Sequence, residues 1–137
     1  MNTQEREDLL RFLEETEKIM AEIVERREQL FRSGLRELIR QAWDEVRPRF
    51  GKLREGVTSG VFDDRLEEVG LRGAQLELKM RGFGMALDEF RRSSTLDLLK
   101  KLLDWINIIL KSLASAIPGG EPIVELKEIL EKEIEEE

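Results

Sequence analysis

The segment from residue 95 to 117 constrains this chain more than any other, because it is apolar around most of a helical circumference. At helical spacing its polar side chains fall in one narrow stripe, and Leu, Ile, Trp and Ala occupy most of the rest. The polar members are Asp97, Lys101, Asp104, Asn107, Lys111 and Ser115. Such a helix has to be surrounded by neighbours of its own chain, by a partner protein or by lipid.

Apolar residues recur every three or four positions in further segments, which predicts more helices. The predicted helices cover residues 3–31, 35–47, 63–92, 95–116 and 122–134. Ser94 with Asp97 three residues later is a capping signature for the fourth helix. We therefore expect an all-α fold of four to five helices in an elongated bundle, forming a single domain over residues 1–137.

The glycines allow more than one position for some boundaries of the predicted helices. Residues 50–62, rich in Gly and Ser, read as a connecting loop. Residues 74–80 also alternate as a strand would, but they lack β-branched side chains and a second strand to pair with, so we favour a helix. A kink is expected at 70–73 or at 82–84. The acidic residues 131–137 lie at the negative end of a helix dipole and should fray.

The side chains that usually perform catalysis are missing, since the chain has no His, Cys or Tyr. A dimetal site in a helical bundle normally needs His, and no phosphate-binding loop or nucleophile motif is present. Only Asp104 has sequence neighbours apolar enough to raise its pKa, and an ion pair with Lys100 or Lys101 is the simpler interpretation. We expect no enzyme, with no catalytic, metal, cofactor or small-molecule site.

Two sets of residues are candidate binding surfaces. The first is an apolar interface on the fourth helix, for which we expect Trp105, Ile106, Ile109, Leu110, Leu113 and Ile117. The second is a basic patch formed by Arg36, Arg40, Arg47, Arg49, Lys52 and Arg54. Acidic residues are interleaved with the basic patch, which favours a solvated or salt-bridged face. An acidic protein partner, such as the Glu-rich end of a second copy, is the next possibility.

The net charge of the chain further limits the classes of partner that it is expected to bind. The net charge is −7, and residues 121–137 alone hold eight acidic and two basic residues. Nucleic acid is therefore disfavoured as a partner. The first residues do not resemble a secretory signal, and together with the absence of Cys this suggests the cytoplasm.

The composition and patterning favour a non-enzymatic protein–protein interaction module, or a subunit of a larger assembly, that docks through apolar helix faces. Its partner would be another protein or a second copy. The alternative is a membrane-active protein that releases the helix 95–117 at a bilayer, with residues 118–120 as a hinge.

Overall fold

The computed structural model describes residues 1–135, and no strand occurs among them. The helices, in chain order, are α1 (Thr3–Arg26), the short 3-10 helix η1 (Glu28–Leu30), α2 (Ser33–Val46), α3 (Arg49–Ser59), α4 (Asp63–Glu68), α5 (Gly73–Ser93), α6 (Leu96–Ala116) and α7 (Glu121–Glu135). The all-α prediction is confirmed. The described chain has six helices of eleven residues or more in addition to the short α4, whereas four to five were predicted.

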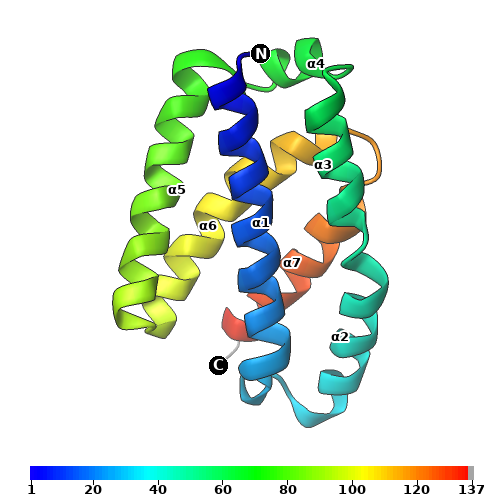
Figure 1. Cartoon of the computed structure of the whole chain (residues 1–137). Coiled ribbons are helices and arrows are strands. Elements are labelled where there is room, and N and C mark those ends of the chain that lie inside the picture. The colour runs from blue at the N-terminus through cyan, green and yellow to red at the C-terminus, as the bar shows by residue number, and fades with distance from the viewer. Residues whose placement is uncertain (136–137) are drawn as a thin grey trace.

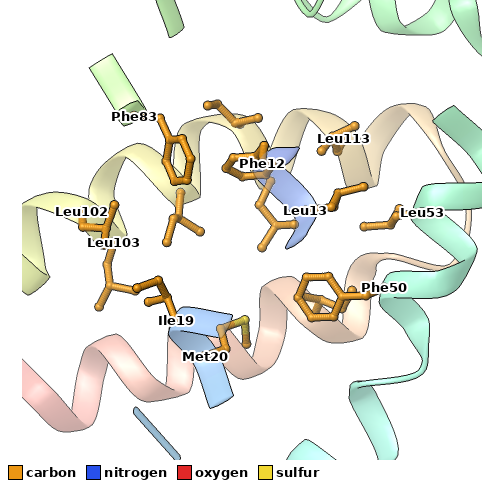
Figure 2. Close-up of a cluster of buried hydrophobic side chains, with 14 of the residues drawn as sticks. Phe12, Leu13, Ile19, Met20, Phe50, Leu53, Phe83, Leu102, Leu103 and Leu113 are labelled. Atoms are coloured by element: carbon orange, nitrogen blue, oxygen red, sulfur yellow. The ribbon is translucent and has the colours of Figure 1, made fainter. Parts of the chain in front are cut away.

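Helix α1 lies at the centre of the molecule (Figure 1). It has α5 on one side and α2 and α3 on the other, while α6 and α7 pass obliquely behind it. Buried side chains from α1, α3, α5 and α6 meet in the space between these layers, and Figure 2 shows part of this cluster. The rings of Phe12 and Phe83 pack edge to face there, with centroids 4.9 Å apart.

The sequence explains where the two longest inner helices begin. Asn2 accepts a hydrogen bond from the backbone N–H of Glu5, and the Glu5 carboxylate accepts one from the N–H of Asn2, which makes a capping box for α1. Helix α6 is capped by Thr95, whose hydroxyl accepts from the N–H of Leu98 at 3.3 Å. The capping residue is thus one position later than the predicted Ser94.

The loop predicted over residues 50–62 is wrong, because most of it forms α3. Pro48 precedes this helix, where a residue without an N–H does no harm. Gly56 serves packing rather than a turn, since a Cβ there would lie 2.5 Å from Cγ2 of Ile117. The chain turns at Gly60, which has a φ of +79°.

The single helix predicted over residues 63–92 is divided into α4 and α5. Gly70 and Gly73 adopt φ angles of +76° and +60°, which end α4 and allow α5 to begin in a new direction. The break falls at the first of the two expected places, while α5 runs without interruption through residues 82–84. The first predicted helix is also shorter than expected, because α1 ends at Arg26 and η1 follows it.

Fraying of residues 131–137 stays a prediction, and the described part of that segment is helical. Helix α7 continues to Glu135, and Ile134 is fully buried in the core. Glu133 is 8% exposed, and its carboxylate pairs with Arg32 at 3.3 Å. Burial and this ion pair hold the last turn against the unfavourable helix dipole. Residues 136–137 lie outside the described part of the chain.

Candidate interaction surface

The predicted apolar interface on α6 lies mostly inside the molecule. Five of its six residues are at most 1% exposed, namely Ile106, Ile109, Leu110, Leu113 and Ile117. Helices α4, α5 and α7 pack against α6, and α1 contributes to the same core. The helices of its own chain therefore cover the apolar side of α6 that carries these five residues. These five side chains are unavailable for docking in this fold, which corrects the predicted site, and Trp105 alone of the six is partly exposed.

The polar stripe of α6 faces outward, as its spacing indicated. Asp97, Lys101, Asp104, Lys111 and Ser115 are exposed, while Asn107 is half-buried against α7. Because Asp104 is exposed, it is not held in an apolar pocket. The ion pair expected between it and Lys100 or Lys101 does not form in the described structure, where Lys101 pairs with Glu89 of α5 at 3.2 Å.

The basic patch is largely occupied by the acidic side of α1 and η1. Arg47 and Arg54 both contact the carboxylate of Glu17, at 3.0 and 2.9 Å. Arg40 pairs with Glu28 at 2.5 Å, and Arg36 donates to the backbone carbonyl of Phe31.

The other two basic residues, Arg49 and Lys52, are exposed. Four of the six thus make contacts within the chain, and the patch is not a continuous basic surface.

The start of α1 is joined to the rest of the bundle by two carboxylates with lowered pKa values. The Arg6 guanidinium hydrogen-bonds Asp63 at 2.6 Å and lowers the pKa of that carboxyl group, and Arg6 also donates to the carbonyl of Val57. Glu5 accepts a hydrogen bond from the N–H of Gly73 at 2.8 Å, which lowers the pKa of Glu5. Both groups connect α1 to the ends of neighbouring helices, so their role is structural.

A different apolar surface lies where α5 and α6 run side by side. The indole ring of Trp105 rests on Gly82, so closely that a Cβ at Gly82 would lie 2.4 Å from ring carbons. Leu78 and Met85 precede and follow Gly82 by four and three residues, on the same side of α5, and are 64% and 60% exposed. Ile108, three residues after Trp105, is 45% exposed. We call Leu78, Met85, Trp105 and Ile108 the α5–α6 face.

Sequence reasoning placed only Trp105 of this face in a binding surface. Leu78 and Met85 fall outside the regular seam of α5, whose residues Leu76, Phe83 and Phe90 are buried. An apolar residue out of phase with a buried seam is the signal that could have found them.

One charged side chain lies entirely within the core. Lys127 of α7 is 0% exposed, and its amine donates to Oδ1 of Asn107 at 2.5 Å and to Oε1 of Glu131 at 2.9 Å. The apolar Ile129, two residues later, is by contrast 49% exposed. The spacing of Ile123, Lys127 and Leu130, four and then three residues, is the signal that was missed.

Two further buried polar atoms, Oγ1 of Thr16 and Nε1 of Trp43, have no hydrogen-bond partner. They come from the buried sides of α1 and α2. They add no site to the surface described above.

No group of three acidic side chains able to hold a metal ion occurs within residues 1–135. No helix in that part of the chain combines the length and hydropathy needed to cross a bilayer. An open groove of about 630 Å³ lies between α1 and α3 and has charged walls. The α5–α6 face is therefore the strongest candidate surface.

Comparison of this chain with models of known protein families, with curated proteins and with solved structures gave no match.

Proposed function

We propose that this chain is a non-enzymatic helical interaction module, working as a subunit of a larger assembly and docking through the α5–α6 face. The observation that carries the proposal is the exposure of Leu78, Met85 and Ile108 around a tryptophan anchored on a glycine. Neighbouring exposed apolar side chains of this size mark interaction sites on soluble proteins.

The chemistry of the face suits recognition of another protein. Tryptophan and methionine are enriched in interface cores, where one or two large side chains carry most of the binding energy. Contact with Gly82 holds the Trp105 ring in one place before a partner arrives. Less side-chain entropy is then lost on binding, which favours affinity. Leu78 and Met85 supply adaptable apolar area on either side.

The membrane-active alternative has less support. Releasing α6 would expose nine buried side chains of that helix, and burial of each large one contributes roughly 1.5–3 kcal/mol to stability. The liposome experiment separates the two functions. Co-flotation with neutral or anionic vesicles, accompanied by dye leakage, would favour the alternative. We expect neither.

The proposed docking is tested by placing a photo-crosslinking amino acid at Arg81, in the cells that express this chain. Arg81 is 64% exposed and lies on α5 between Leu78 and Met85, so the apolar residues stay intact. The control carries the same amino acid at Glu14, which is 63% exposed on α1.

We expect an adduct of discrete mass from position 81 and none from position 14. An adduct with a second copy or with another protein supports docking through this face. No adduct at position 81, or equal yields at both positions, would contradict the proposal.

A further inference from the structure

We infer that the α5–α6 face binds the same face of a second copy of this chain, about a two-fold axis that runs along the two helices. This inference rests on the proposed function and names its partner. It is carried by the arrangement of charge on the face.

The register of the two helices is set by two contacts. Trp105 of α6 lies on Gly82 of α5, and Lys101 pairs with Glu89 at 3.2 Å. The residue numbers rise along α5 as they fall along α6, so the two helices run in opposite directions, and Figure 1 shows α6 crossing at an oblique angle to α5. Residues of α5 and α6 whose numbers add to between about 185 and 190 therefore lie at the same height along the pair.

Apart from Arg91, which pairs with Glu15 and Glu22 of α1, the exposed charges alternate along each helix in opposite order. On α5 they run acid, base, acid, base, at Glu77, Arg81, Asp88 and Arg92. At matching heights on α6 they run base, acid, base, acid, at Lys111, Asp104, Lys101 and Asp97. All eight side chains are exposed. Four of them also make surface ion pairs within the chain, Glu77 with Arg81, Lys101 with Glu89 and Lys111 with Glu128 of α7. Each acid on one helix is thus level with a base on the other.

A two-fold axis along the pair places α5 of one copy over α6 of the other. The rotation leaves the position of each residue along the pair unchanged. Each of these four acids of one copy is then level with a base of its partner. The apolar residues match in the same way, because Leu78 is level with Ile108 and Met85 with Trp105. One operation therefore satisfies both the charged and the apolar parts of the face, as an isologous interface requires.

The charge balance of the face also favours a second copy over a strongly charged partner. Its four acids and four bases cancel, although the whole chain carries a net charge of −7. Two such faces approach without like-charge repulsion between them. A markedly acidic or basic partner would leave half of these charges facing their own sign.

The first measurement is the mass of the purified full chain by sedimentation and light scattering over a hundredfold range of concentration. We expect the mass to rise from that of one 16.0 kDa chain toward twice that value. A chain that stays monomeric throughout overturns this inference. If the crosslink at position 81 then captures a different protein, the proposed function stands without it.

The second measurement tests the register with charge reversals at one predicted pair. Arg81→Glu and Asp104→Lys should each weaken the dimer by about tenfold or more, because each brings like charges together twice per dimer. An equimolar mixture of the two variants should dimerise as well as the unmodified chain, since each mismatch is then paired with its complement. The double variant should also dimerise normally.

Glu14→Lys on the outer side of α1 is the matched control and should leave the dissociation constant unchanged. Circular dichroism shows whether each variant is folded. If the mixture or the double variant fails to restore dimerisation in folded chains, the proposed two-fold packing is wrong. The same holds if Leu78→Asn, which removes apolar contact at the face, leaves the dimer intact.

Discussion

Two seams of the molecule are of opposite kind, the one between α1 and the helices α2, α3 and α4, and the one between α5 and α6. Towards α2, α3 and α4, charged side chains bridge between the helices, with Glu17 joined to Arg47 and Arg54, and Arg6 joined to Asp63. Between α5 and α6, the helices approach closely at Gly82 and Trp105, and only one ion pair, Lys101 with Glu89, connects them among the described residues.

The difference shows which surface is left for a partner. The charged seam uses its Arg and Glu side chains within the chain, so a cluster that looks basic in the sequence presents few free charges. The close-packed seam is joined mainly by apolar side chains, together with the contact of the Trp105 ring with Gly82. Its exposed charges and apolar side chains remain outside, where a second surface can meet them.

The largest effect is expected from filling the close approach at Gly82. Gly82→Ala puts a methyl group where the Trp105 ring lies, and overpacking of this kind costs about 1–3 kcal/mol, partly offset by about 1 kcal/mol of helix propensity. We expect a net loss of unfolding free energy, measured by urea denaturation.

Gly84→Ala is the matched control for this substitution. Nothing lies within 4 Å of a Cβ at Gly84, so only the gain in helix propensity, up to about 1 kcal/mol, should appear. Stabilisation by both substitutions would show that the ring moves aside freely, and that the seam is not closely packed.

Removal of a charge from the other seam should have a smaller effect. Glu17→Gln leaves Arg47 and Arg54 without their shared carboxylate and should destabilise the fold by roughly 1 kcal/mol. The loss should shrink as salt is added, because these Arg side chains are more than 40% exposed. Glu14→Gln, at an exposed position of α1, should change the unfolding free energy far less. Equal losses would contradict the charge-bridged seam.

The charged seam should also be sensitive to acid. The pKa of Asp63 is lowered in the folded chain by Arg6, so this pair stabilises the fold above the unfolded-state pKa of about 3.9. That contribution is lost as the pH falls through the lower folded-state pKa. Asp63→Asn should therefore reduce stability near neutral pH and flatten its loss in acid, measured by thermal unfolding at several pH values. An unchanged acid profile would contradict this.

The smallest effect is expected for the single ion pair of the close-packed seam. Glu89→Gln should cost only a few tenths of a kcal/mol, because its partner Lys101 is 56% exposed. A loss as large as that of Glu17→Gln would mean that charge holds both seams together, and the contrast between them would disappear. Urea denaturation at low salt is the sensitive measurement here.

The predictable part of this fold came from long apolar periodicity. The pattern of residues 95–116 indicated both the helix α6 and its outward polar stripe, and the seam of Leu76, Phe83 and Phe90 indicated α5. These patterns are local, since each helix must bury its own apolar side. The helix itself was therefore predictable before its neighbours were known.

The unpredicted parts depend on neighbours distant in sequence. Gly56 reads as a loop residue until Ile117 is found against it, sixty-one positions later. The candidate interface on α6 was misplaced for the same reason, because periodicity shows that a face is buried and not which helix covers it. The phase of Leu78 and Met85 shows that they lie outside the buried seam of α5, but only the contact of Gly82 with Trp105 places them beside α6.

The buried amine of Lys127 affects how α7 aligns with α6. Sliding α7 by one turn, about 5.4 Å, would carry this cation away from Asn107, which belongs to α6 and would stay behind. Glu131 would travel with the lysine, but one carboxylate cannot accept all three of its protons. Apolar side chains tolerate such a shift far better than a buried ammonium group does. This one lysine therefore penalises misaligned packings of the helix, and so helps the chain to reach a single arrangement.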